Sequence, residues 1–257
     1  MVQLLGDVKA TYTMCPCPAH HPCSSFWFQT YLANSRHTVL VSGDIHEIRG
    51  YNRLSKLVHA KILIVLQDDD MPPVKHLWID HLMSAFNNNK KLGFIGGFTG
   101  TIQGGPQTGK FGVGRSTMPT KAANKRPFMF VTLTNIGPFV MRQDLFWHTG
   151  MFNMNFSCRG DPGIGFDYEF SLRTWWKGYQ VGLFKPDFVY HWGDWSKSGT
   201  RANRGLYRRR QTIEKRNSKY HLDMYGPRSG RDFYWRQGLP GRPTAFKTPR
   251  EGLKGIG

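Results

Sequence analysis

Acidic residues are scarce in this chain. Its 257 residues include 17 Asp and Glu against 35 Lys and Arg, which gives a formal net charge of +18. Such an excess favours anionic partners, either nucleic acid, acidic lipid or a phosphorylated substrate, without choosing among them. A long apolar run is also missing: residues 62–66 have strand length, well below the ~20 residues of a membrane span. The first residues lack the layout of a secretory signal, so we expect a cytoplasmic or peripheral membrane location by default.

Cysteine is sparse as well, and three of the four cysteines fall in one short segment. Cys15, Cys17 and Cys23 lie in CPCPAHHPC together with His20 and His21, all of which are zinc-ligand types. The spacing matches no standard C-x-x-C pair, and the prolines stiffen the segment. An irregular leader segment is therefore favoured over a zinc site, and the cysteine count does not indicate a redox compartment.

Apolar residues are present in the amount that a packed core requires. Hydrophobic residues make up 39% of the chain and aromatic residues 14%, which argues against wholesale disorder. The length suits one sizeable α/β domain or two small ones.

Hydrophobic periodicity predicts alternating strands and helices. Residues 37–42 form an apolar strand, 48–59 have helical spacing, and 61–67 form a second strand, an order typical of a βαβ unit in a parallel sheet. The other predicted helices are 76–87, 143–149, 166–177 and 204–220, and the other strands are 8–14, 93–98, 128–135, 138–141 and 180–190. Residues 99–126 are predicted to be a long loop or an irregular hairpin.

The three consecutive acids Asp68, Asp69 and Asp70 directly follow an apolar strand. Open α/β sheets bind ligands at the carboxyl ends of their strands, so the position favours a site over a solvated turn. Three adjacent carboxylates repel one another unless they take up protons or gain a counter-charge. A divalent cation with oxygen ligands meets this need and can bridge to a diphosphate.

The segment that contains these acids resembles a known enzyme family. IRGYNRLSKLVHAKILIVLQDDDMPP is similar to the stretch that leads into the DxD motif of GT-A-fold glycosyltransferases, above all the inverting family-two group. Asn52 stands at the place of that family's helix Asn, and the Asp triplet at the place of its metal-binding acids.

Two further blocks follow in the order that the family has them. TNIGPFVMRQDLFWHTGMFN is similar to its strand and "GG-F" turn, and GFDYEFSLRTWWKGYQVGLF to its "W-E-D-x-D-L-x-x-R-x-x-x-x-G-Y" helix. Asp167 falls on the catalytic Asp position, Glu169 on the following acid, and His191 on the strand-end His of the metal shell. Two departures stand out: Phe166 replaces the usual Glu, and the family's first strand is not recognisable.

The resemblance implies a fold, a reaction and a set of site residues. The fold would be α/β, a GT-A mixed and mostly parallel sheet flanked by helices, over residues 31–195. Residues 1–30 would be an irregular or divergent segment, and 196–257 a basic helix with a flexible tail. The reaction would move a sugar from a nucleoside-diphosphate sugar to a hydroxyl of a glycan, protein or lipid. The implied residues are Asp68, Asp70 and His191 for Mn²⁺ or Mg²⁺, Asp44, Asn52, Asp68 and Asp69 for the donor, Asp167 as general base and Glu169 as the second candidate.

Some charged residues have two interpretations. Arg49 and Arg53 lie on the predicted helix 48–59, where they could meet the diphosphate or point into solvent. Asp167 and Glu169, at the start of a helix, could equally serve as capping acids, since the helix dipole favours negative charge there.

The net charge leaves other classes of protein open. A catalytically inactive transferase fold and a basic nucleic-acid-binding protein are the alternatives, although no known nucleic-acid-binding module is recognisable, which disfavours nucleic acid. The Arg-rich helix 204–220 could also contact an acidic membrane. Neutralising the Asp triplet distinguishes these classes, because an enzyme would lose function and a charge-driven binder would not.

Overall fold

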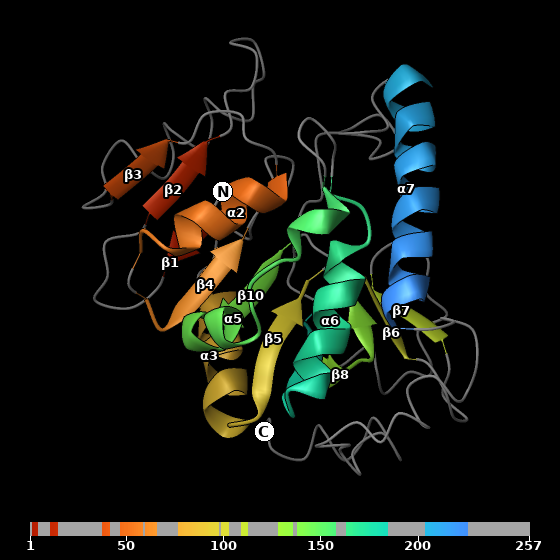
Figure 1. Cartoon of the computed structure of the whole chain (residues 1–257). Coiled ribbons are helices and arrows are strands. Elements are labelled where there is room, and N and C mark those ends of the chain that lie inside the picture. The colour runs from red at the N-terminus through yellow and green to blue at the C-terminus, as the bar shows by residue number, and fades with distance from the viewer. Residues whose placement is uncertain are drawn as a thin grey trace.

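The structure of the chain is a computed structural model (Figure 1). The structure describes residues 2–4, 11–14, 38–41, 47–58, 60–65, 77–97, 99–102, 109–112, 128–135, 138–157, 163–184 and 204–225.

A six-stranded mixed sheet lies at the centre of the fold, with strand order β1-β4-β10-β5-β11-β8. Strands β4, β5 and β11 run in one direction, and β1, β10 and β8 run in the other. The strands are β1 (Val2–Leu4), β4 (Ile62–Val65), β5 (Leu92–Gly96), β8 (Phe128–Phe130), β10 (Phe139–Arg142) and β11 (Gln180–Phe184).

Two smaller sheets accompany the central one. The first pairs β2 (Thr11–Met14) with β3 (Thr38–Val41) in parallel. In the second, β6 (Thr99–Ile102) pairs antiparallel with β7 (Gly109–Gly112) and with β9 (Leu133–Thr134). Of the two structures predicted for residues 99–126, a long loop or an irregular hairpin, the hairpin is therefore found for residues 99–102 and 109–112, and the rest of the range lies outside the described residues.

Helices cover both faces of the central sheet, as the alternation of buried side chains along the strands shows. Leu63 and Val65 of β4 pack in one core cluster with side chains of α2, α5 and α6, whereas Ile62 and Ile64 pack in a second cluster with α3. The helices are α2 (Glu47–Ser55), α3 (Leu77–Asn88), α5 (Gln143–His148), the 3₁₀ helix η2 (Met154–Phe156), α6 (Phe166–Trp176) and α7 (Arg204–Tyr225).

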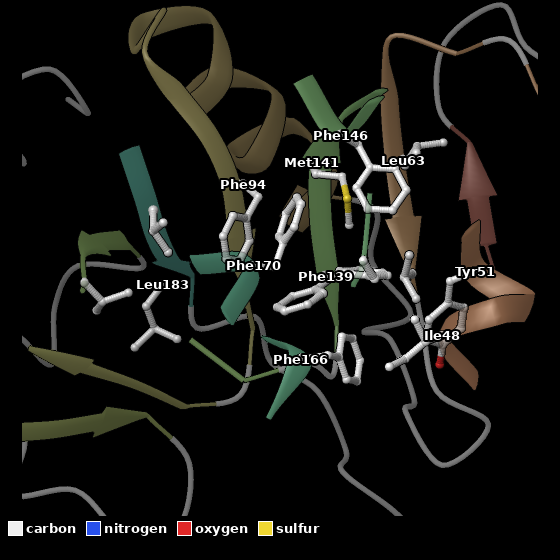
Figure 2. Close-up of a cluster of buried hydrophobic side chains, with 14 of the residues drawn as sticks. Ile48, Tyr51, Leu63, Phe94, Phe139, Met141, Phe146, Phe166, Phe170 and Leu183 are labelled. Carbon is white, nitrogen blue, oxygen red and sulfur yellow. The ribbon is translucent and has the colours of Figure 1, made fainter. Parts of the chain in front are cut away.

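The first cluster is built largely from phenylalanine rings (Figure 2). Phe152 lies at its centre, with ring centroids 4.8 to 5.8 Å from those of Phe139, Phe146, Phe166 and Phe170. The pair with Phe139 is stacked and the other three are edge-to-face, and such aromatic pairs contribute about 0.5–1.5 kcal/mol each beyond the area they bury. The cluster therefore joins α2, α5 and α6 to the sheet through the segment that contains Phe152.

The pairing of the strands corrects one expectation. A mixed sheet flanked by helices is confirmed, but a mostly parallel one is wrong, because β5–β11 is the single parallel pair among the described strands of the central sheet. The predicted parallel pairing of β3 with β4 is also wrong, since β3 pairs with β2 and β4 pairs with β1 and β10. Strand β10 comes later in the chain and inserts between β4 and β5 in the opposite direction.

Helix α7 packs on the rest of the fold through one buried stripe. Ile213, Asn217 and His221 are buried at spacings of four residues, and the ring of Tyr220 packs edge-on against Phe156. None of the helices in the described part of the chain combines the length and the apolar content that crossing a membrane would take.

Candidate functional site

Strands β4 and β5 end at the same edge of the central sheet, which we call the carboxyl edge. Strand β10 begins there, so that Phe139 pairs with Val65 at the end of β4 and with Gly96 at the end of β5. Strand β11 ends at this edge too, because Leu183 pairs with Gly96. In the sequence, the acids Asp68–Asp70 follow Val65 by three to five residues.

The turn after β5 brings a polar residue of β6 to the carboxyl edge. The N–H of Gly97 donates to the carbonyl of Pro138 (3.0 Å), and Thr99 starts β6 two residues later. Asn135 lies beside it, with its N–H donating to the carbonyl of Thr99 (2.8 Å). Gly96 makes this approach feasible, since a Cβ there would lie 1.9 Å from Oγ1 of Thr134.

The side chain of Asn135 connects Thr99 to the predicted base Asp167. Its Oδ1 accepts hydrogen bonds from the hydroxyls of Thr99 (2.5 Å) and Tyr168 (3.2 Å), and its Nδ2 donates to Oδ2 of Asp167 (3.2 Å). The orientation of the amide is determined by these partners, because an ionised carboxylate accepts hydrogen bonds and cannot donate them.

Asp167 occupies the first turn of α6 and is 6% exposed. The helix begins after Gly165, which has φ +83°, and Oδ1 of Asp167 accepts from the N–H of Tyr168 (2.9 Å). A second contact anchors this turn to β9: Ser171 Oγ donates to the carbonyl of Asp167 (2.8 Å) and accepts from the N–H of Thr134 (3.2 Å). The carboxylate of Asp167 is thus held at a helix N-terminus, where the dipole favours the ionised form.

Glu169 faces a different partner. Its carboxylate is fully buried and accepts two hydrogen bonds from Arg173, at 2.6 Å and 2.8 Å. Arg173 also donates to the carbonyls of Thr149 and Met151. This ion pair therefore secures the turn in which Gly150 (φ +89°) and Met151 (φ +60°) both have left-handed backbone conformations.

Asn52 binds the residue that follows this turn. Its Nδ2 donates to the carbonyl of Phe152 (2.7 Å), and its Oδ1 accepts from the N–H of Phe152 (3.0 Å). With 6% of its surface exposed, Asn52 fixes the backbone of Phe152 from inside α2.

The start of α6 is also held from α7. Nδ2 of Asn217 donates to the carbonyls of Phe156 (2.7 Å) and Ile164 (2.8 Å), which flank residues 157–163 in the sequence. The hydroxyl of Tyr220 accepts from Asn155 (2.9 Å). The basic helix thus contacts the segment that leads into the turn of Asp167.

The predicted site residues fall into two groups. Asn52, Asp167 and Glu169 are described, and each has distinct partners. The other predicted donor and metal residues lie outside the described residues; they are Asp44, Asp68, Asp69, Asp70 and His191. Among the residues that are described, no group of three or more His, Cys, Asp or Glu is arranged to hold a metal ion.

Sequence reasoning missed Asn135, Thr99 and Tyr168. Asn135 ends a predicted strand next to Gly137, which is an ordinary place for an Asn, and it lies 32 residues from Asp167 along the chain. No local pattern pairs the two; a polar residue inside the TNIGP block was the available signal.

Comparison with known proteins gives a likeness at the level of the fold. No family model and no curated protein matches this chain. A solved structure does: the crystal structure of GalNAc-T7 with UDP, GalNAc and Mn²⁺ matches with a TM-score of 0.52 at 11% identity, over 96% of this chain and 50% of that one. The chain has a GT-A-type α/β fold. It spans about half the length of the structure that it matches.

A second solved structure has a weaker likeness. The structure of CMP:2-keto-3-deoxy-manno-octonic acid synthetase complexed with CTP has a TM-score of 0.38 at 16% identity, over 71% of this chain and 74% of that one.

Proposed function

We propose that the protein is a metal-dependent glycosyltransferase that moves a sugar from a nucleoside-diphosphate sugar to an acceptor hydroxyl. The fold supports this, because a GT-A-type sheet presents a donor site at the carboxyl ends of its strands. The observation that carries the proposal is the place of Asp167: Asn135, itself bonded by Thr99, holds its carboxylate beside the turn that follows β5. Strand β4, which the Asp triplet follows in the sequence, ends at the same edge of the sheet.

In the proposed reaction Asp167 is the general base. The acceptor hydroxyl transfers its proton to the Asp167 carboxylate while its oxygen attacks the anomeric carbon of the donor. The bond between that carbon and the diphosphate oxygen breaks, and the nucleoside diphosphate leaves, with inversion at the anomeric carbon. Asn135 orients the carboxylate through its amide hydrogen bond. Glu169 fits this role less well, because Arg173 bonds both of its oxygens.

The proposed cation ligands are Asp68, Asp70 and His191, with Asp44 and Asp69 toward the donor. Carboxylate oxygens with one imidazole are a donor set that suits Mn²⁺ or Mg²⁺. These residues would hold the divalent cation, which would neutralise the charge on the leaving diphosphate. Asn52 contributes by fixing the Phe152 backbone within the core.

Calorimetric titration tests the proposal. UDP, GDP and CDP are titrated into the native protein and into Asp70→Ala, each with and without Mn²⁺. UDP leads the panel because the matched GalNAc-T7 structure contains it together with Mn²⁺. We expect metal-dependent binding of one nucleotide to the native protein and at least a tenfold weaker binding to the variant. If a folded native protein binds none of the three, the transferase proposal is wrong.

A second function is supported by the outer face of α7. Arg204, Arg208, Lys215 and Lys219 are exposed and lie along the side of the helix opposite Ile213 and Asn217. We propose that this cationic stripe contacts an acidic membrane, an activity that a catalytically inactive fold could retain. Each cation near an anionic bilayer adds about 1 kcal/mol of binding free energy.

Vesicle sedimentation tests the cationic stripe against a matched control. Replacing its four residues with Gln should release the protein from phosphatidylglycerol-containing vesicles. Replacing Arg53, Lys56, Lys90 and Lys91, which are exposed elsewhere, removes the same charge and should leave more of the protein bound. Equal losses for both variants would contradict a dedicated surface.

A further inference from the structure

Arg49 lies in the first turn of α2, at the carboxyl edge of the sheet. The other end of α2 is placed by Gln143, whose Nε2 donates to the carbonyls of Ser55 (2.9 Å) and Val58 (2.5 Å). Gln143 directly follows Arg142, which pairs with Ile62 at the start of β4. Strand β4 runs from the opposite edge of the sheet to the carboxyl edge, and a short connection joins the end of α2 to the start of β4. The start of α2 therefore lies at the carboxyl edge.

Contacts of the neighbouring residue place this turn beside α6. Ile48 packs over Gly163, where a Cβ would lie 2.7 Å from Cδ1 of Ile48 and 2.8 Å from Cδ1 of Phe166. Asp167 is the next residue after Phe166. The side chain of Arg49 therefore starts next to the helix turn that carries the proposed base.

Within the described part of the chain, the guanidinium of Arg49 has fewer oxygen acceptors than such a group normally has. Its buried Nε has no hydrogen-bond acceptor among these residues, and its Nη1 donates to the thioether sulfur of Met154 at 3.7 Å, which is a weak acceptor. The single ion pair among the described residues joins Glu169 to Arg173 and does not involve Arg49.

Two other partly buried arginines in the same fold donate their hydrogen bonds to oxygen acceptors. Arg142 donates from Nε to the carbonyl of Leu92 (3.1 Å) and from Nη2 to that of Phe86 (2.7 Å). Arg173 donates to Glu169 and to two carbonyls. The described residues thus offer oxygen acceptors to these two guanidinium groups and none to the Nε of Arg49.

We propose that Arg49 binds a phosphate oxyanion of the ligand, which in the proposed transferase reaction is the diphosphate of the nucleotide sugar. The planar guanidinium offers two parallel N–H groups to two phosphate oxygens, a geometry that a lysine cannot reproduce. The site and the proposed base then lie at the same edge of the sheet. The identity of the ligand rests on the proposed function. The inference that Arg49 binds an anion rests on the contacts of Arg49.

Arg53 provides a matched control for the experiment. It lies one turn further along the same side of α2, carries the same charge and is exposed. Calorimetric titration of UDP, GDP and inorganic pyrophosphate is performed on the native protein, Arg49→Gln, Arg49→Lys and Arg53→Gln at equal ionic strength. We expect Arg49→Gln to raise the Kd of the diphosphate ligand at least tenfold and Arg49→Lys to raise it by a smaller factor. Arg53→Gln should change this Kd by less than twofold.

Thermal unfolding without ligand separates binding from folding. Because the Nε of Arg49 has no acceptor among the described residues, we expect Arg49→Gln to unfold at the native temperature or above it. A lower unfolding temperature with an unchanged Kd would make Arg49 a structural residue and overturn the proposal. An equal weakening by Arg53→Gln would also overturn it, because bulk charge would then explain the binding.

The panel distinguishes this inference from the proposed function. If the native protein binds pyrophosphate but no nucleotide, and Arg49→Gln loses that binding, the anion site stands and the transferase proposal fails. If a nucleotide binds equally to the native protein and to Arg49→Gln, the transferase proposal stands and Arg49 is not part of the site. Failure of the native protein to bind any of the three ligands overturns both.

Discussion

Asn52 encloses the backbone of Phe152 with two hydrogen bonds, accepting from its N–H and donating to its carbonyl. Phe152 is also the centre of the aromatic cluster that joins three helices to the sheet. One side chain of α2 thereby determines the position of a core residue that lies 100 residues later in the chain.

Replacing this amide should destabilise the whole fold. Asn52→Ala leaves a buried N–H and a buried carbonyl at Phe152 without these partners, which costs about 2–4 kcal/mol of unfolding free energy. Urea unfolding followed by tryptophan fluorescence measures it. Asn87→Ala, at an exposed position of α3, is the control and should change the stability by less than about 0.5 kcal/mol. Similar losses of unfolding free energy in the two variants would show that the two hydrogen bonds of Asn52 contribute little to stability.

The ion pair between Glu169 and Arg173 leads to a second prediction. Glu169→Ala leaves the guanidinium of Arg173 with two backbone carbonyls and no counter-charge, so we expect a loss of about 3–5 kcal/mol. The left-handed turn at Gly150 and Met151 loses its support at the same time. Asp223→Ala removes an exposed carboxylate from α7 and should be nearly neutral in the same unfolding experiment.

A third prediction separates Asp167 from Glu169 as the base. Once titration has identified the donor, Asp167→Asn should lower the rate of sugar transfer by about 10²–10⁴-fold while the Kd for the nucleotide stays within twofold. Asp80→Asn, an exposed acid in the first turn of α3, is the control and should keep the native rate. A variant Asp167→Asn that transfers sugar at the native rate would exclude Asp167 as the base.

Asn135 should act on the rate through Asp167. Asn135→Ala removes the amide that orients the carboxylate, so we expect kcat to fall by roughly tenfold with little change in donor KM. Asn135→Asp places a second carboxylate where Nδ2 now lies, 3.2 Å from Oδ2 of Asp167. Two carboxylates so close repel unless one takes a proton. This variant should therefore be less stable relative to the native protein at pH 8 than at pH 5, as measured by urea unfolding at both values.

The attachment of α7 gives a fifth prediction. Asn217→Ala removes both hydrogen bonds to the carbonyls of Phe156 and Ile164, at a cost of about 1–3 kcal/mol. Amide hydrogen exchange should accelerate in residues 163–167, where α6 begins. Gln211→Ala, exposed on the same helix, should leave this exchange unchanged. Unaltered exchange in Asn217→Ala would mean that α7 does not hold the start of α6.

Local sequence predicted several helices well, because each depends on the periodicity of its own residues. The predicted helix 48–59 is shorter, since α2 ends at Ser55, and the predicted strand 128–135 is divided into β8 and β9 of two different sheets. The predicted helices 76–87, 143–149 and 166–177 correspond to α3, α5 and α6 to within one residue at each end. Helix α6 is followed by a glycine in the left-handed conformation that commonly ends helices: Gly178 has φ +81°. Helix 204–220 continues to residue 225 as α7.

Strand pairing could not be predicted in the same way. Residues 37–42 and 61–67 have similar apolar patterns, and nothing in either shows that β3 pairs with β2 while β4 pairs with β1 and β10. The partner of a strand depends on which other strand completes its hydrogen bonds and shares its buried face, and β10 lies more than seventy residues after β4.

The same division holds for the candidate site. The sequence by itself determined that Asp167 and Glu169 lie in the first turns of one helix, because apolar spacing defines that helix. Tertiary structure alone decided that Asp167 accepts from Asn135, which in turn accepts from Thr99, that Glu169 is bonded by Arg173, and that Asn52 holds Phe152. Helix and strand periods arise from contacts between near neighbours in the chain, whereas these side-chain partners come from elements that meet only when the sheet and its helices pack together.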